Sequence, residues 1–94
     1  MTLLDDAQIE ERLGSLAGWQ RAGGSEIERE LRFTDFAAAI NFVNRVAELS
    51  ETANHHPDIF LHGWNKVRLT LSTHSQGGLT DADFKLAGRI DQLP

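Results

Sequence analysis

Two segments of the chain alternate between apolar and polar residues. In residues 27–33 an apolar face that only Arg29 interrupts alternates with charged positions, and residues 67–71 alternate without a break. A period of two residues predicts half-buried β-strands. Shorter stretches at 19–21 and 59–61 lie next to glycine-containing turns, so they predict two further strands.

Residues 36–54 carry the strongest helical periodicity in the chain. We expect Thr34 or Asp35 to cap this helix, and we expect it to end by His56, because Pro57 disfavours a helical conformation in the residue before it. Its apolar stripe is interpreted as core or subunit interface. The stripe consists of Phe36, Ala39, Ile40, Val43, Val46 and Ala47, widened by Phe42 and Leu49.

Two shorter helices complete the pattern, one at residues 5–16 and one that opens at Thr80. The predicted order is therefore α-β-β-α-β-β-α. Hairpins between neighbouring strands imply an antiparallel sheet. The sequence thus predicts an α+β fold, a two-layer sandwich in which a four-stranded antiparallel sheet carries helices on one face. Residues 1–94 are expected to form a single domain.

Composition narrows the possible functions. The 94 residues include no cysteine, which excludes disulfides and thiol nucleophiles, and the small core favours self-association. The net charge of −5 disfavours nucleic acid as a partner. The first residues lack the pattern of a signal peptide, and no apolar run is long enough to span a bilayer. We therefore expect a cytoplasmic protein that does not enter a membrane.

Three of the four histidines lie at the ends of predicted elements. His55 and His56 end the long helix, and His74 follows the last strand. Residues in such positions are held by a rigid element yet reach a ligand, and histidine exchanges protons near neutral pH. Together with nearby acids, they form a plausible acid–base site, although spacing alone does not bring them together. The nearby acids are Glu51, Asp58 and Asp83.

Three stretches in this order resemble the pterin-4a-carbinolamine dehydratase family. They are ETANHHPD (51–58), LSTH (71–74) and GLTDADFKLA (78–87), and the resemblance covers roughly residues 30–93. The resemblance implies the predicted element order, a homodimer or homotetramer, and no metal or organic cofactor. It also implies dehydration of 4a-hydroxytetrahydropterin to quinonoid dihydropterin, in the pathway that recycles the pterin cofactor of aromatic amino-acid hydroxylases.

The resemblance also implies roles for the histidines. His55, His56 and His74 match residues that line the family's site, and we assign His55 and His74 as acid and base, with His56 holding the pterin. General acid–base assistance is typically worth about 10²–10⁴-fold in rate. Glu51 precedes His55 by four residues. On a helix the two would share a face, so a hydrogen bond between them is expected.

The matching polar residues are expected to contact the substrate. Asp83 matches an acid near the start of the family's last helix, but it also stands three residues after Thr80, as in a capping box, and both roles are compatible. The predicted substrate-binding residues are Glu51, Asn54, Thr73, Ser75 and Asp83.

Segment 60–65 departs from the family pattern. It is one residue longer and follows Ile59, where the family often has tryptophan, so we expect a bulge or an altered turn. Trp64 is a candidate replacement for that aromatic. His62 matches no functional position and is interpreted as solvent-exposed or turn-stabilising.

Two other functions remain open. Some relatives in the family act as coactivators or assembly factors, so a non-catalytic interaction module on the same fold is the main alternative. A metal-dependent hydrolase that uses His55, His56 and His74 is the second alternative. It is disfavoured, because helical metal ligands are usually three or four residues apart.

Overall fold

The computed structural model describes residues 2–94, and its elements follow the predicted order. The sequence pattern placed each element within a few residues of its observed position, except that the first helix is shorter than predicted. The helices are α1 (Asp6–Leu13), α2 (Phe36–Ala53) and α3 (Asp81–Asp91). The strands are β1 (Gln20–Ala22), β2 (Glu26–Arg32), β3 (Asp58–His62) and β4 (Lys66–Leu71), and a short 3₁₀ turn, η1 (His74–Gln76), follows β4.

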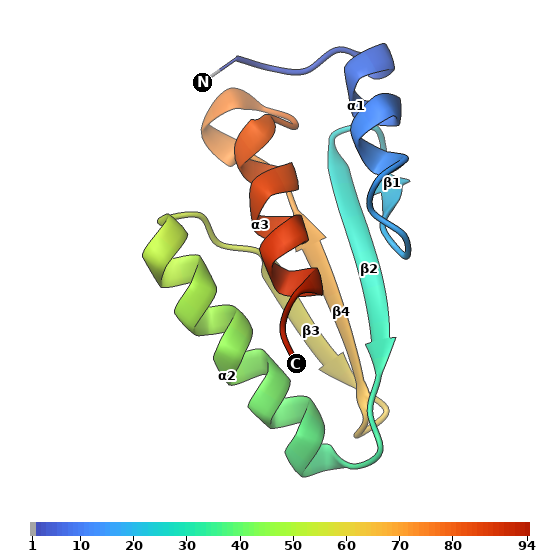
Figure 1. Cartoon of the computed structure of the whole chain (residues 1–94), viewed down its shortest axis with the longest axis vertical. Helices are drawn as coiled ribbons and strands as arrows, with labels where there is room; N and C mark the ends of the chain where they lie inside the picture. Colours follow the sequence, from blue (N-terminus) through green and yellow to red (C-terminus); the bar gives the residue numbers. More distant parts are fainter. Residues whose placement is uncertain (1) are drawn as a thin grey trace.

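The four strands form one antiparallel sheet in the order β1-β2-β4-β3. Chain order and sheet order differ because α2 carries the chain from β2 to the far edge, where β3 forms a hairpin with β4. Helices α2 and α3 lie side by side against one face of this sheet (Figure 1). The predicted α+β sandwich is therefore confirmed.

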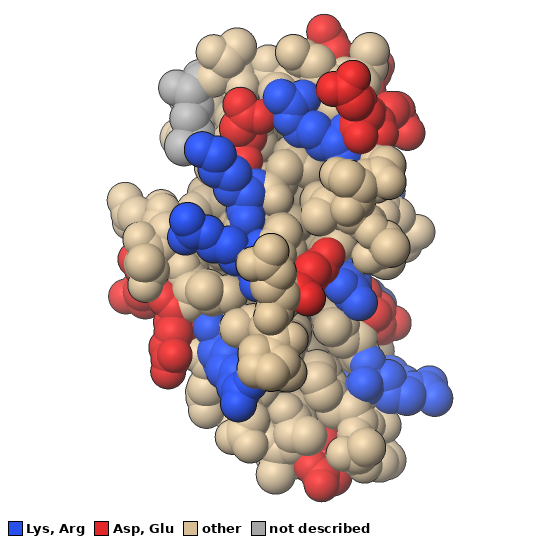
Figure 2. All heavy atoms as spheres, in the orientation of Figure 1, with Lys and Arg blue, Asp and Glu red and all other residues tan. Residues whose placement is uncertain are grey.

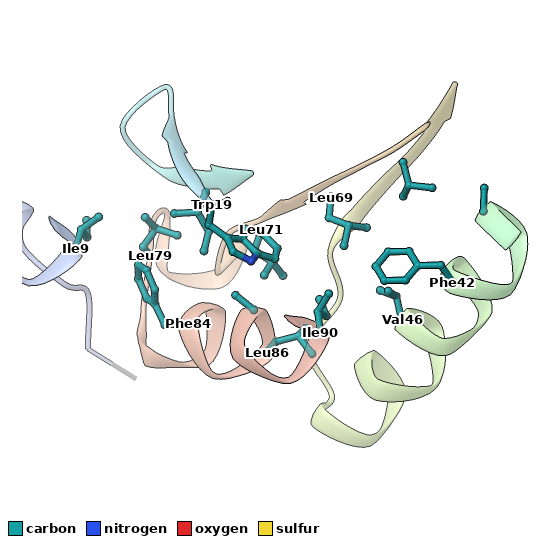
Figure 3. Packing of buried hydrophobic residues seen from close by; sticks show 14 residues of the cluster. Ile9, Trp19, Phe42, Val46, Leu69, Leu71, Leu79, Phe84, Leu86 and Ile90 are labelled. Atoms are coloured by element: carbon teal, nitrogen blue, oxygen red, sulfur yellow. The ribbon is translucent and has the colours of Figure 1, made fainter. Parts of the chain in front are cut away.

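Alternation along β4 sets the inner face of the sheet. Val67, Leu69 and Leu71 are fully buried beneath the helices, whereas the residues between them face away from the helices. Figure 3 shows Leu71 beside Trp19 and the apolar side of α3, and Leu69 between α3 and the side chains of α2. The core is one continuous cluster that includes residues of all three helices. Burial of large apolar side chains contributes about 1.5–3 kcal/mol each.

Helix α2 begins as predicted but turns a different edge of its apolar stripe toward the core. Asp35 is the N-cap and accepts a hydrogen bond from the Ala38 N–H (2.7 Å). The fully or nearly fully buried positions are Ala39, Phe42, Val46 and Ser50. Phe36 and Ile40, which the pattern assigned to the centre of the stripe, are exposed. The apolar surface of α2 is wider than the area that the sheet and α3 cover.

Arg29, the residue that interrupts the apolar face of β2, has a structural partner. Its guanidinium contacts the Asp91 carboxylate at 2.5 Å, and the indole N–H of Trp19 donates to the same oxygen at 2.9 Å. The Arg29 side chain also lies against Gly18, where a Cβ would come within 2.9 Å of Nε. This cluster fixes the C-terminal end of α3 to the sheet.

The hairpin between β3 and β4 turns through Gly63, Trp64 and Asn65, with positive φ angles of 55° and 59° at the first two. Asn65 accepts from the backbone N–H of Phe33 and donates its side-chain amide to the carbonyl of the same residue. Trp64 is 60% exposed at the tip of this turn. It therefore lies at the opposite end of β3 from His55 and His56, so the prediction that it replaces a pocket aromatic beside them in this chain is wrong.

Candidate active site

The end of α2 determines where His55 points. Asn54 adopts a left-handed conformation (φ 50°, ψ 43°) and terminates the helix, and the backbone N–H of His55 donates back to the Ser50 carbonyl at 3.1 Å. Asparagine tolerates this conformation better than most residues. The reversal carries His55 off the axis of α2 and toward the first turn of α3.

His55 forms a short contact with Asp83 there. Its Nε2 lies 2.5 Å from Oδ1 of Asp83, and the two side chains are 13% and 0% exposed. The two residues are 28 positions apart in the chain. The structure thus joins the end of α2 to the start of α3 through a histidine–carboxylate pair that is almost entirely shielded from water.

The other oxygen of Asp83 has two donors of its own. Oδ2 accepts from the Thr73 hydroxyl at 2.8 Å and from the backbone N–H of Thr80 at 2.9 Å. The Thr73 and Thr80 hydroxyls lie 2.8 Å apart, and Thr80 and Asp83 form the predicted capping box. Because Oδ2 accepts from two donors and an ionised carboxylate accepts through both oxygens, we assign His55 Nε2 as the donor to Oδ1. Its Nδ1 is then the nitrogen available to a ligand.

His56 has a carboxylate partner in a different setting. Its Nε2 lies 2.5 Å from Glu51, but the side chains are 55% and 77% exposed. The predicted hydrogen bond between Glu51 and His55 is therefore wrong. The helical spacing that would align them does not extend past Asn54, so His55 turns to Asp83 and leaves Glu51 to His56.

Of the remaining predicted residues, Thr73, His74 and Ser75 lie on or beside η1, and Asn54 is the C-cap of α2. Thr73 is buried and belongs to the Asp83 network, whereas His74, Ser75 and Asn54 are exposed. The His74 side chain makes no hydrogen bond or ion pair with any of residues 2–94. It nevertheless follows directly after Thr73, which places its backbone beside the network that holds His55.

A cavity of about 420 Å³ opens between the end of α2 and α3. Of the predicted site residues it includes His55, but His56, His74, Glu51 and Ser75 are not part of its wall. The sequence analysis did not identify most of the residues that line the cavity. The helical spacing of the lining residues on α3 could have indicated that they share one face. The wall consists of Thr52, Ala53, His55, Asp81, Ala82, Lys85, Leu86 and Arg89.

His62, on the face of the sheet away from the helices, contacts Glu30 across the strands. Arg68 lies 3.7 Å from the same Glu30 oxygen, and the His62 ring stacks on Phe60 with centroids 4.8 Å apart. The hydrogen bond from His62, which is the largest cause, and the nearby positive charges lower the pKa of Glu30 below its ordinary 4.5. His62 is only 26% exposed and stabilises a strand pairing rather than a turn.

The described chain contains neither a metal-binding cluster nor a membrane-spanning helix. Within residues 2–94, no group of three or more histidine and acidic side chains is arranged to hold a metal ion. No helix in the same range has the length and apolar character needed to cross a bilayer.

A family model and the similar curated proteins point to the same family. The family model described as pterin 4 alpha carbinolamine dehydratase matches residues 2–93. A protein from Roseiflexus castenholzii is 55% identical over 91 residues (97% of this chain, 96% of the relative), and one from Acidobacterium capsulatum is 53% identical over 93 residues (99% of each). Both are provisionally named pterin-4-alpha-carbinolamine dehydratases.

Solved structures with the same fold carry more than one kind of role. A transcriptional coactivator/pterin dehydratase from Brucella melitensis has a TM-score of 0.90 and 36% identity, with 96% of each chain covered. A pterin dehydratase-like protein identified as a RuBisCO assembly factor of the alpha-carboxysome has a TM-score of 0.65 and 25% identity, covering 79% of this chain and 86% of that one.

Proposed function

Because the chain belongs to the pterin 4 alpha carbinolamine dehydratase family, we propose that it dehydrates 4a-hydroxytetrahydropterins to quinonoid dihydropterins in pterin cofactor recycling. The observation that carries the proposal is the His55–Asp83 pair at the wall of the cavity between α2 and α3. The proposal includes a cytoplasmic location and a place in a pathway with aromatic amino-acid hydroxylases.

The reaction needs two proton transfers. As the C4a–O bond breaks, the lone pair of the adjacent ring nitrogen forms a C=N bond. Hydroxide is a poor leaving group, so one proton must reach the departing oxygen, and another must leave the ring N–H. Water and the quinonoid dihydropterin are the products, so no oxidant or reductant is consumed.

His55 is suited to one of these transfers. Asp83 accepts from its Nε2 and is itself held by Thr73 and Thr80, so the ring is fixed and Nδ1 is free to act on the substrate. His74 is proposed as the second acid–base group, because its backbone adjoins this network. His56, which is paired with the exposed Glu51, is proposed to hold the pterin.

The remaining substrate contacts are proposed for Asn54, Thr73 and Ser75, which flank the histidines. Thr73 already donates to Asp83, so its contribution is mainly to position the His55–Asp83 pair. Asn54 and Ser75 are exposed and available to the polar edge of a pterin.

Dehydration of a freshly generated 4a-hydroxytetrahydropterin by the purified protein tests the proposal directly. The wild type is expected to exceed the rate in buffer, and His55→Ala and His74→Ala are expected to fall far below the wild type. A wild-type rate equal to that in buffer would remove the enzymatic function. The cavity with His55 would then have to serve another purpose.

A role as an interaction module is the second candidate, and exposed apolar residues support it. Phe36, Phe60 and Trp64 are 52%, 54% and 60% exposed, and Ile40 adds to the exposed side of α2.

We propose that a second copy of this chain covers the α2 surface in a homodimer or homotetramer, because a 94-residue chain without disulfides gains stability from further burial. A monomer in sedimentation experiments would contradict this.

A further inference from the structure

The cavity beside His55 carries two positive charges that have no partner within the described chain. Lys85 and Arg89 both line it, both are exposed, and neither makes an ion pair or a side-chain hydrogen bond with any of residues 2–94. Arg12, Arg21 and Arg29, by contrast, each pair with an aspartate: Asp81, Asp6 and Asp91. Two uncompensated cations on one cavity wall are notable in a chain whose net charge is −5.

The one acidic residue in the cavity wall does not cancel this charge. Asp81 is engaged by Arg12, whose Nε and terminal nitrogen each lie 2.9 Å from Oδ1. Because Arg12 offsets the charge of Asp81, Lys85 and Arg89 leave the cavity wall with a net positive charge. Figure 2 shows lysine and arginine side chains gathered along α3 on its side toward α2.

The positions of these residues along α3 separate the cavity into two ends. Ala82, Lys85, Leu86 and Arg89 recur at helical spacing and share one face of the helix. His55 is bound to Asp83 in the first turn, and Arg89 stands about 9 Å further along the axis at about 1.5 Å per residue. A ring placed beside His55 would therefore direct a substituent along α3 toward the two cations.

We propose that this cavity selects a reduced pterin whose side chain ends in an anion, a carboxylate or a phosphate, with Lys85 and Arg89 as the residues that determine this specificity. The inference rests on the proposed function, because it assigns the pterin ring to the end of the cavity that His55 lines. Lysine and arginine at a partly exposed rim bind such groups by charge, with arginine able to form two parallel hydrogen bonds.

Binding measurements with pairs of pterins test the assignment. The probes are 6-carboxypterin and neopterin monophosphate as anionic ligands and biopterin as the neutral ligand, each followed by quenching of pterin fluorescence. The wild type is expected to bind an anionic ligand about tenfold more tightly than biopterin at low salt, and this preference is expected to shrink as salt is added. The two anionic probes distinguish a carboxylate from a phosphate source.

Variants separate the two cations from general charge effects. Lys85→Gln combined with Arg89→Gln is expected to remove the preference, so that this variant binds the anionic pterins no more tightly than it binds biopterin. Arg32→Gln combined with Lys66→Gln changes the net charge equally, but these paired residues lie on the sheet face away from the helices, so the preference is expected to persist.

The possible failures are distinguishable. Equal affinity for anionic and neutral pterins, unchanged in the Lys85/Arg89 variant, would overturn the inference and leave the proposed dehydration intact. Loss of preference in both double variants would also overturn it, because the effect would then be one of overall charge. Failure of every pterin to bind, together with no dehydration, would remove the proposed function as well.

Discussion

His55 and His56 are neighbours in the chain, and each lies 2.5 Å from a carboxylate, but the two pairs differ in almost every other respect. Asp83 is fully buried, and its two oxygens accept from three donors. The Glu51 side chain is 77% exposed and pairs with His56. Water and salt screen the outer pair, whereas the inner pair is screened little.

The difference shows that the distance between the partners does not by itself determine how much each pair contributes to stability. An exposed ion pair contributes about 0–1 kcal/mol, because water competes for both partners. A buried carboxylate with several donors fixes its neighbours, since any partner left unpaired would lose its hydrogen bond without regaining one from water. His55 is therefore held in one orientation, whereas His56 is free to reorient when a ligand approaches.

Asp83→Asn is expected to have the largest effect of any single change at the site. The amide replaces one acceptor oxygen with a donor that faces donors, so the free energy of unfolding should fall by about 3 kcal/mol. Glu51→Gln is the matched change in the outer pair and should cost less than about 1 kcal/mol. Urea unfolding followed by circular dichroism measures both. Equal losses in the two variants would refute the ranking.

His55→Gln and His56→Gln compare the two histidine pairs by their effect on the rate of dehydration. If His55 transfers a proton, the rate of dehydration should fall by about 10²–10⁴-fold, because the glutamine amide does not exchange protons. His56→Gln should reduce it less than about tenfold, the scale of an exposed contact. Initial rates on the 4a-hydroxytetrahydropterin report both, with unfolding curves as the control for folding. A larger loss in His56→Gln would reverse the assigned roles.

The fold followed from the sequence because its signals are local. Alternation in residues 67–71 and the caps at Asp35 and Thr80 depend on neighbours in the chain, and the structure confirms each of them. The inner side of α2 was harder to define. Phe36 and Ala39 are equally apolar by pattern, and only the packing of α2 against the sheet and α3 determines which of them the core covers.

The site was less predictable because its contacts cross the chain. His55 finds Asp83 over 28 positions, and a single left-handed residue, Asn54, redirects it there. No spacing rule carries that information. The histidines and Asp83 were identified through the family motif, but the motif gave no indication of which histidine pairs with which carboxylate.

Asp91→Asn tests whether the two ends of α3 have separate roles. Asp91 accepts from Trp19 and Arg29, with Arg29 and Asp91 28% and 21% exposed, so the anchor is intermediate in burial between the two histidine pairs. The free energy of unfolding should fall by about 1–2 kcal/mol. The dehydration rate at a temperature well below the transition should not change, because Asp83 and His55 remain in place. A rate loss comparable to that of His55→Gln would contradict this separation.

The third histidine–carboxylate pair is His62 with Glu30. Its expected effect on stability is the smallest, and it is measured through the pH dependence of unfolding. The pKa of Glu30 is lowered in the folded chain, mainly by the hydrogen bond from His62, with positive charge from His62, Arg68 and Lys66 adding to it. A lowered folded pKa means that the folded state binds fewer protons than the unfolded state. The pair therefore stabilises the fold above pH 4.5, and that contribution is lost as pH falls below 4.5 through the lowered pKa.

Glu30→Gln removes this dependence, so the variant and the wild type should differ in stability near neutral pH and converge in acid. Urea midpoints at neutral pH and well below pH 4.5 measure the convergence. Added salt should narrow the neutral-pH difference, because Glu30 is 46% exposed and its partners are screened. Glu28→Gln is the control, because Glu28 lies two residues before Glu30 on the same face of β2. This variant should show no such convergence. A difference between wild type and Glu30→Gln that persists in acid would mean that packing of His62 on Phe60, rather than charge, stabilises this face.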